Sequence, residues 1–351
     1  MQKLKLFYPP DLFNEKLRSE WFELIKSKER FQRKKNEIDG NIQAAIEWVK
    51  SADLADVCIL PLNWNIYYAK GLQQKALDWC NQMKSINKRV LSFTGGDQGI
   101  TVPVPDNVIV YRQSGYRSTL KEYERTAPFF LSDPVTELKQ ATEDELFISK
   151  KNTKPIVGFC GMAPHGLKTS FKERFQILVR NAKQSVGISN YDKQAVLSSS
   201  NLRFTVLKVF KNSKSFNTNY VIRKKYRGGE QTAENRKKTT KEYYQNQIDS
   251  DLIICVRGVG NFSLRLYETL AMGRIPIFID TDSPLPDIGS DNWHDHIIWV
   301  DKNELKRAPE IAMNWLNERD LIGQKKKNRA LWIEQFRLDN YWLNQIALFK
   351  P

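Results

Sequence analysis

Cysteine and histidine are scarce in this sequence. The 351 residues include four cysteines and three histidines, and the cysteines have neither CxxC spacing nor the density of a disulfide framework. Most of them lie inside apolar runs, which indicates buried free thiols in a reducing compartment. A metal site built on paired cysteines or a disulfide-stapled fold is therefore not expected. The cysteines are Cys58, Cys80, Cys160 and Cys255.

Long hydrophobic runs are absent as well. No window reaches the roughly 20 apolar residues that are needed to cross a bilayer. The first residues, Met1 to Lys5, lead straight into a short strand and lack the apolar core of a signal peptide. We therefore expect a cytoplasmic protein.

Acidic residues are too few to balance the basic ones. The sequence has 55 Lys and Arg against 40 Asp and Glu, which gives a formal net charge of +15 at pH 7. This surplus indicates a polyanionic partner, and nucleic acid, anionic lipid head groups and nucleoside diphosphates all qualify. Charge alone does not choose among the three.

The rest of the composition is that of a globular protein, with 41% hydrophobic and 11% aromatic residues. A chain of this length is most economically two domains. We place an N-terminal domain at residues 1–150, a second domain at 151–330, and a C-terminal helix at 331–351 that is expected to pack back on the first domain. The charged stretch 137–154 is the predicted linker.

Short apolar runs alternate with helical stretches along the chain, and this alternation predicts parallel α/β sheets in both halves. In the first half we expect strands at residues 4–8, 57–62, 89–93 and 108–111, and helices at 12–35, 42–49 and 68–85. In the second half we expect strands at 155–160, 204–209, 252–256 and 275–279, and helices at 170–184, 241–248, 264–272 and within 325–349. The polar, basic segment 212–241 is predicted to be a long excursion that carries function or mobility.

The segment 250–282 carries the most chemical information. Residues 252–256 are continuously apolar, as in a strand that is covered on both faces. Arg257 follows this strand, and a loop with Gly258 and Gly260 comes next. Glycines let the backbone of such a loop approach a ligand closely. The carboxyl end of this strand is therefore a candidate binding site.

The helix behind this loop has the features of an anion site. Asn261 and Ser263 are good N-cap residues, and a helix N-terminus after a parallel strand favours phosphate through its free amides and its dipole. Arg257 and Arg265 can add charge-assisted contacts to two phosphate groups. Glu268 projects from the same helix face as Arg265 and suits a ribose diol, which offers two hydroxyl donors. The segment therefore predicts a nucleotide-diphosphate pocket.

These residues resemble the signature of the exostosin family of glycosyltransferases, in which a strand is followed by Arg-Gly, a loop, Ser-x-Arg-x-x-Glu and Gly-x-x-Pro. The similarity is strong over residues 243–299 and collinear over the rest. It favours a binding site over the alternative interpretation of an ordinary capped helix with a surface Arg–Glu pair. The pattern is met here by Arg257, Gly258, Ser263, Arg265, Glu268, Gly273 and Pro276.

The resemblance implies a GT-B fold of two Rossmann-like domains facing a central cleft, an inverting reaction and a nucleoside-diphosphate sugar donor, with UDP as the expected nucleotide. The sugar would pass to a hydroxyl of a glycan acceptor, in polysaccharide or glycoconjugate synthesis. A bacterial- or virus-like member without the membrane anchor of the animal proteins is expected. The alternative function is a non-catalytic protein that keeps the fold and binds anionic glycan or nucleic acid.

An inverting transferase needs a base that takes the proton of the acceptor hydroxyl. One candidate is Asp97, in a Gly-rich turn after the strand at 89–93. Family members usually have a His after that Asp, whereas this chain has Gln98. The other candidate is His165, in the loop after the first strand of the second half. The alternative interpretations are a turn aspartate and a structural loop histidine.

Neither a cofactor nor a metal is expected. Asp280 and Asp282 imitate a DxD metal motif, but at the end of a strand beside Pro284 they favour a turn. His294 and His296 lack a third ligand nearby and are interpreted as surface residues rather than a metal site. Cationic side chains and helix amides can stabilise a leaving diphosphate in place of an ion.

Four basic clusters remain, and each is interpreted as a solvated face. Their number favours peripheral contact with the inner, anionic face of a membrane that carries a lipid-linked glycan acceptor. Nucleic acid is not expected as a partner. A nucleic-acid site would combine basic residues with aromatic residues that stack on the bases, and Tyr226 is the one aromatic residue placed among these basic clusters. The clusters lie at residues 33–35, 223–225, 236–238 and 325–327.

Overall fold

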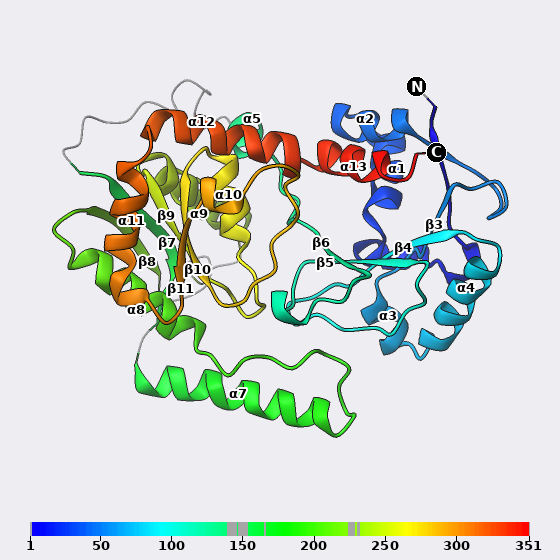
Figure 1. The fold of residues 1–351 in the computed structure, drawn as a ribbon, viewed down its shortest axis with the longest axis horizontal. Coiled ribbons are helices and arrows are strands. Elements are labelled where there is room, and N and C mark those ends of the chain that lie inside the picture. Colours follow the sequence, from blue (N-terminus) through cyan, green and yellow to red (C-terminus); the bar gives the residue numbers. More distant parts are fainter. Residues whose placement is uncertain are drawn as a thin grey trace.

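The computed structural model describes residues 2–138, 146, 154–164, 166–223, 229 and 232–350. Within these residues the chain forms two parallel β-sheets with helices packed around each (Figure 1). The strand order is β2-β1-β3-β4-β5-β6 in the first sheet and β11-β10-β9-β7-β8 in the second. The predicted fold class is confirmed: two Rossmann-like α/β domains, as in the GT-B class. No helix in the described part of the chain combines the length and the apolarity of a membrane span.

The four central strands of the first sheet were predicted from their apolar runs, and the structure confirms them. Their inward side chains, among them Leu6, Ile59 and Val90, are fully buried. Two short edge strands were not predicted, β2 (Ile46–Trp48) and β6 (Glu124–Thr126). The central strands are β1 (Leu4–Phe7), β3 (Val57–Ile59), β4 (Arg89–Phe93) and β5 (Val108–Arg112).

The helices of the first domain differ from the prediction at three boundaries. The helix expected at 12–35 begins at Glu23, because two 3-10 helical segments precede it. The helix expected at 42–49 ends at Ala45, because the next residues pair with β1. The helix expected at 68–85 is interrupted at Gly71, whose φ of +67° ends one helix before the next begins. The helices are α1 (Glu23–Lys34), α2 (Glu37–Ala45), α3 (Trp64–Ala69) and α4 (Gln73–Ser85).

In the second sheet, the strands predicted at 155–160, 252–256 and 275–279 are confirmed as β7 (Ile156–Met162), β9 (Leu252–Cys255) and β10 (Ile275–Asp280). The helices predicted at 170–184 and 264–272 are α7 (Leu167–Ser185) and α10 (Leu264–Ala271). Gly273 follows α10 with φ +58°, as expected for a residue that ends a helix. Strand β11 (Ile298–Asp301) and helix α11 (Ala308–Asn317) complete this side of the sheet.

Two predictions between β7 and β9 are wrong. Residues 204–209 are not a strand but part of α8 (Ser199–Lys211), whose buried residues Leu202, Val206 and Phe210 repeat at helical spacing. The segment 212–241 is not an open excursion, because it contains the edge strand β8 (Asn217–Arg223) and the start of α9 (Ala233–Ile248). β8 pairs with β7 along its whole length. Its polar composition fits an edge strand in which no residue is fully buried.

The C-terminal stretch connects the two domains. α12 (Leu321–Leu331) and the π-helical segment Trp332–Phe336 pack on α10. α13 (Leu338–Ala347) lies against the first domain, beside α1 and α2 (Figure 1). There the Trp342 ring lies 5.2 Å from the ring of Phe22, and the Tyr111 hydroxyl donates to Gln345 at 2.9 Å.

One basic cluster differs from its interpretation as a solvated face. Lys325, the first residue of the cluster at 325–327, is buried, and its Nζ lies 2.6 Å from Oδ1 of Asp251. A buried ammonium group needs such a carboxylate partner, because desolvation otherwise disfavours its charge. Lys325 therefore holds α12 to the second sheet and is not available to an outside partner.

The predicted linker at 137–154 lies for the most part outside the described residues. α5 (Pro134–Leu138) leads into it. Leu146, the one described residue in its middle, is buried in a cluster with Val135, Tyr244 and Met272. Its carbonyl oxygen accepts a hydrogen bond from Arg274 of the second domain.

Candidate functional site

In the second sheet, the direction in which successive strands are added reverses between β7 and β9. From β7 the chain continues to β8 on one side, and β9 then joins on the other side of β7. Ligands of open α/β sheets bind outside the carboxyl ends of the strands at such a switch point. At this edge, β7 is followed by Ala163, and β9 is followed by Val256 and then Arg257.

Three arginines from three elements converge on this edge. Arg257 follows β9, Arg265 lies in the first turn of α10, and Arg203 comes from α8. Arg203 donates to the carbonyl oxygens of Met162, through Nη1 at 2.6 Å, and Arg257, through Nη2 at 3.1 Å. Arg265 donates through Nη2 to the carbonyl oxygen of Cys160 at 2.9 Å. The backbone at the ends of β7 and β9 therefore holds the guanidinium groups of Arg203 and Arg265 in place.

Each of the three guanidinium groups keeps one buried donor without a described acceptor. The Nε–H of Arg203, Arg257 and Arg265 is buried in each case and has no acceptor among the described residues. Burial, and then the neighbouring charge of Arg265, lower the pKa of Arg203 to about 10. Like charges gathered in a partly buried place are stabilised by a bound anion.

Arg257 also reaches towards the first domain. Its Nη1 lies 3.3 Å from the hydroxyl of Tyr116, and its Nη2 lies 3.5 Å from Oε1 of Gln194. Gln194 in turn donates through Nε2 to the carbonyl oxygen of Gln98 at 3.0 Å. The arginine is thus fixed between the two domains.

Three residues of this site, Arg203, Tyr116 and Gln194, were not predicted. They lie far from the segment 250–282 in the chain, and no local motif marks Tyr116 or Gln194. A usable signal did exist for Arg203: its apolar neighbours repeat at helical spacing, and Ser198 caps that helix by accepting from the Asn201 N–H. The residues directly after Arg203, 204–209, were instead predicted to form a strand.

Glu268 lies one turn after Arg265 on α10, and a residue of α9 fixes its carboxylate. The Tyr243 hydroxyl donates to Oε2 of Glu268 at 2.5 Å. Burial and the nearby carboxylate raise the pKa of Tyr243 well above its ordinary value, so Tyr243 remains a donor. Arg265 and Glu268 are both half-buried.

The loop between Arg257 and α10 contains the other predicted binding residues. Gly258 has open space where a Cβ atom would stand, whereas a Cβ atom at Gly260 would overlap the carbonyl oxygen of Asp97 in the first domain. Ser263 occupies the N-cap position of α10, but its side chain makes no capping hydrogen bond. The start of α10 therefore has no side-chain cap.

Asn261 differs from its predicted role as a ligand contact. The residue is fully buried, and its Nδ2 donates to the carbonyl oxygens of Gly115, at 2.9 Å, and Thr281, at 3.2 Å. Its Oδ1 accepts from the hydroxyls of Thr281, at 2.7 Å, and Ser283, at 3.1 Å. With both ends of its amide engaged, Asn261 joins the loop to the end of β10 and to the first domain.

The two candidate bases are placed as follows. Asp97 follows β4 and is exposed, and its backbone carbonyl oxygen lies against Gly260 in the loop of the second domain. Its carbonyl oxygen accepts from the Ser114 hydroxyl at 2.5 Å. No described residue donates a hydrogen bond to its carboxylate. His165 lies outside the described residues.

Asp280 and Asp282 form the predicted turn at the end of β10. The Asp282 N–H donates to Oδ1 of Asp280 at 2.8 Å, and Asp282 has φ +63°. Their side chains join the first domain, because Arg117 lies 2.9 Å from Oδ2 of Asp280 and the Ser118 hydroxyl donates to Asp282. Both carboxylates thus serve the contact between the domains.

His294 and His296 are separated by their surroundings. His294 is exposed, and its ring lies 4.8 Å from that of Trp299. His296 is fully buried, which corrects its interpretation as a surface residue. Its ring nitrogens lie 3.1 Å from Oδ1 of Asn328 and 3.1 Å from Oδ2 of Asp291. In the described part of the chain, no three His, Cys, Asp or Glu residues are grouped closely enough to hold a metal ion.

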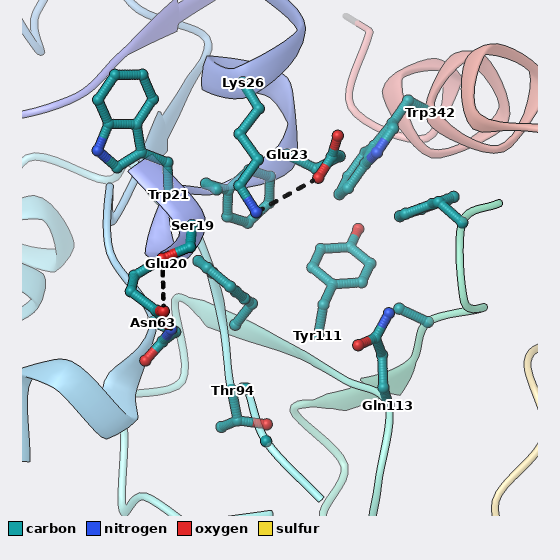
Figure 2. Close-up of a pocket in the computed structure, with 16 residues that line it drawn as sticks. Ser19, Glu20, Trp21, Glu23, Lys26, Asn63, Thr94, Tyr111, Gln113 and Trp342 are labelled. Atoms are coloured by element: carbon teal, nitrogen blue, oxygen red, sulfur yellow. Dashed lines mark hydrogen bonds and ion pairs between the residues drawn. The ribbon is translucent and has the colours of Figure 1, made fainter. Parts of the chain in front are cut away.

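A cavity of about 250 Å³ lies in the first domain at the carboxyl ends of β4 and β5 (Figure 2). Trp342 extends towards it from α13, and Asn63 donates to the Glu20 carboxylate on the opposite side (Figure 2). Thr94 and the two glycines that precede Asp97 belong to its lining. Its aromatic lining is formed by Trp21, Phe22, Phe93, Tyr111, Phe130 and Trp342.

A comparison with protein families finds a match that covers most of the second domain. The family described as the RXYLT1 C-terminal domain matches residues 182–337, fewer than half of the chain. The matched part includes Arg203 and the whole of the segment from Arg257 to Glu268. No curated protein sequence matches the chain.

Solved structures with some similarity have low sequence identity. A glycosyltransferase from Rickettsia africae ESF-5 is 13% identical and covers 100% of this chain and 98% of its own, with a TM-score of 0.40. The spinosyn rhamnosyltransferase SpnG, complexed with thymidine diphosphate, is 9% identical over 95% and 82%, with a TM-score of 0.33. The spinosyn forosaminyltransferase SpnP is 9% identical over 99% and 100%, with a TM-score of 0.35. The family match and the exostosin-like motif inside it support a glycosyltransferase, and the second domain of this chain is similar to the RXYLT1 C-terminal domain.

Proposed function

We propose that the chain is an inverting glycosyltransferase that uses a nucleoside-diphosphate sugar, with UDP as the expected nucleotide. The observation that carries this proposal is the group of three arginines at the switch point of the second sheet. Each has a buried Nε–H without an acceptor among the described residues. A diphosphate supplies several anionic oxygens and would satisfy these donors together.

The donor's diphosphate binds between Arg203, Arg257 and Arg265, near the uncapped start of α10. Charge builds up on this diphosphate as the bond to the sugar breaks. Guanidinium groups that the protein already holds in place therefore stabilise the transition state more than the ground state. We propose that these cations act without a metal ion or another cofactor.

The nucleoside lies beyond the diphosphate, where Glu268 accepts hydrogen bonds from the two ribose hydroxyls. The bond from Tyr243 orients the Glu268 carboxylate before the ligand arrives. A carboxylate that is already oriented loses less conformational entropy on binding.

In the reaction, the acceptor hydroxyl oxygen attacks the anomeric carbon from the face opposite the diphosphate. The new carbon–oxygen bond forms while the bond from that carbon to the phosphate oxygen breaks, and the diphosphate leaves with the electron pair. The hydroxyl proton passes to a base, and we assign Asp97 because the residue is exposed and its backbone lies against the donor-site loop of the second domain. His165 is the second candidate for this role.

The acceptor is a glycan or a lipid-linked glycan presented at the cytoplasmic face of a membrane. The aromatic cavity of the first domain suits one sugar unit, because apolar faces of a sugar ring pack on aromatic rings. Polar groups such as Glu20 and Asn63 can then bind the hydroxyls at the ring edge. Its lining runs up to Gly96, directly before Asp97.

The experiment that tests this proposal offers the purified protein a panel of UDP-, GDP- and TDP-sugars. Binding is read as a rise in melting temperature, and turnover as release of the nucleoside diphosphate. We expect one nucleotide to stabilise the protein, and Arg203→Ala to remove the stabilisation. Arg307→Ala, which changes an exposed arginine of the same domain, is the matched control.

Two outcomes would contradict the proposal. If no sugar nucleotide raises the melting temperature and none is turned over, the arginines serve another anion. If a nucleotide binds but no acceptor supports turnover, the chain is the non-catalytic binding protein considered as the alternative.

A further inference from the structure

Helix α7 exposes an apolar face that no other described part of the chain covers. None of its residues from Leu167 to Ser185 is buried, and the helix lies apart from both sheets at the lower edge of the view in Figure 1. The exposed fraction of its outward apolar side chains ranges from 39% for Val179 to 91% for Leu167, whereas Ile177 is half-buried. The exposed apolar residues are Leu167, Phe171, Phe175, Leu178 and Val179.

These residues form one continuous stripe along the helix. At 100° per residue, positions 167, 171, 175, 178 and 179 fall within about 120° of one another. Phe171 and Phe175 extend the stripe as neighbouring rings with centroids 6.3 Å apart. A stripe of this width normally faces a protein core, but here it faces solvent.

The charge around the stripe is almost entirely positive. α7 contains five basic residues and one acidic residue, Glu173. Glu173 points the other way, because it accepts hydrogen bonds from the hydroxyls of Ser198 and Ser200. The outward surface therefore combines aromatic and aliphatic side chains with a rim of cations. The basic residues are Lys168, Lys172, Arg174, Arg180 and Lys183.

The polar face of α7 rests on the segment that reaches the candidate site. Asn181 donates to the carbonyl oxygen of Gln194 at 2.7 Å and accepts from the Gln194 N–H at 2.8 Å. The Gln194 side chain lies beside Arg257 and is bonded to Gln98 of the first domain. A surface that binds the outer face of α7 would therefore lie next to the donor site.

We propose that α7 is an interfacial helix that docks this protein on an anionic lipid bilayer. An amphipathic helix with Phe and Leu on one face and Lys and Arg around it lies in the head-group region with its apolar face inserted. The cations of α7 complement anionic lipid head groups. A second copy of the chain fits less well, because pairing two such helices would bring their like charges together.

The test uses the full chain and sedimentation with vesicles of two compositions. One is phosphatidylcholine alone, and the other is phosphatidylcholine and phosphatidylglycerol in equal amounts. We expect binding to the anionic vesicles that weakens with added salt. The double variant Phe171→Ser, Phe175→Ser should lower the partition coefficient roughly tenfold or more, because two exposed rings no longer insert.

A second variant and a control separate the contributions. Lys172→Glu with Lys183→Glu should reduce binding to the anionic vesicles while it leaves the apolar stripe intact. Leu54→Ser removes an exposed apolar side chain of the first domain and should bind as the wild type does. All variants should keep the wild-type melting temperature, since the changed side chains are exposed.

The proposal is overturned if the wild type does not sediment with anionic vesicles, or if the double serine variant sediments equally well. It is also overturned if the wild type is a dimer in solution that the serine variant dissociates, because a second copy is then the occupant. These readouts require no sugar nucleotide and no turnover. Failure of the donor-site proposal would therefore leave them unchanged.

Discussion

At the scale of single residues, the candidate site depends on donors that the protein leaves partly unsatisfied. Arg203, Arg257 and Arg265 each use their terminal nitrogens on backbone or side-chain oxygens and keep a buried Nε–H without a described acceptor. An unsatisfied buried donor costs about 1–3 kcal/mol. Three of them in one place are readily explained by a bound anion.

The first prediction concerns the ribose contact. Glu268→Ala should keep the fold and abolish measurable donor binding, because the ribose hydroxyls lose their acceptor. Tyr243→Phe should weaken binding by about 1 kcal/mol, since the carboxylate remains but loses its orienting hydrogen bond. Calorimetric titration with the nucleotide found by the donor panel measures both effects. Glu304→Ala, at an exposed glutamate of the same domain, is the control, and unchanged affinity in Glu268→Ala would remove this residue from the site.

The second prediction concerns the arginines. Arg257→Ala and Arg265→Ala should lower kcat about 100-fold to 1,000-fold, more than they raise KM, because their contribution peaks as charge develops on the leaving diphosphate. Arg203→Ala should differ from these two variants, because we expect it to remove donor binding itself, as the melting-temperature experiment reads out. Steady-state kinetics with saturating acceptor separates the two parameters. A rise in KM with intact kcat would mean that the arginines bind only the ground state.

At the scale of secondary-structure elements, central strands were predicted correctly and edge strands were not. The seven central strands of the two described sheets were all predicted, whereas the edge strands β2, β6, β8 and β11 were all missed. Central strands are covered on both faces and read as continuous apolar runs. The edge strands β2, β6 and β8 have an exposed side and carry polar residues, and β2 and β6 are short. β11 is short as well, but it is mostly apolar.

The third prediction concerns α13 and its acid sensitivity. Burial raises the pKa of Asp339, but hydrogen bonds from Arg337 and Asn41 outweigh this and bring it below the ordinary value. A lowered folded-state pKa stabilises the fold above the ordinary carboxyl pKa of about 3.9, and this contribution is lost as the pH falls through the folded-state pKa. Asp339→Asn should therefore lower the free energy of unfolding by about 1–3 kcal/mol at pH 7.

Urea unfolding at several pH values measures this difference between the variant and the wild type. The difference should shrink as the pH falls below about 4, because the wild-type carboxylate is then being protonated as well. Asp106→Asn, at an exposed aspartate of the first domain, should show no comparable difference. A gap that stays constant down to low pH would show that the charge of Asp339 does not hold α13 in place.

At the scale of the whole molecule, the two domains are joined by polar contacts on the side of the candidate site. Arg117 and Ser118 of the first domain reach Asp280 and Asp282 of the second, and Asn261 donates to Gly115. The aspartates are thus occupied by protein partners. These contacts join the first domain to the donor-site loop and to the end of β10.

The fourth prediction follows from that assignment of the aspartates. Activity should survive EDTA, because the arginines and the start of α10 provide the positive charge at the diphosphate. Asp282→Asn should be mild, at about 0–1 kcal/mol, because its contact with Arg117 is a partly exposed ion pair. The measurement is turnover with and without EDTA in both proteins. Complete loss in EDTA that Mn²⁺ or Mg²⁺ restores would show that Asp280 and Asp282 hold a metal ion.

The sequence by itself determined the central strands of both sheets and the position of Arg257, Arg265 and Glu268 relative to one another. These features are local. A continuous apolar run specifies a covered strand, and three-residue spacing places two side chains on one helix face. The turn of Asp280 and Asp282 was predictable for the same reason, since it depends on neighbouring residues alone.

Only the tertiary structure decided which distant residues join them. Arg203 of α8 lies at the site although it is distant in sequence. The Asn261 side chain instead bonds to residues at the end of β10 and in the first domain. The periodicity of α7 groups its apolar residues on one side, but it does not say whether that side meets the protein or the solvent. Such outcomes depend on long-range packing, because a helix or strand pattern specifies which side chains share a face and leaves open what covers it.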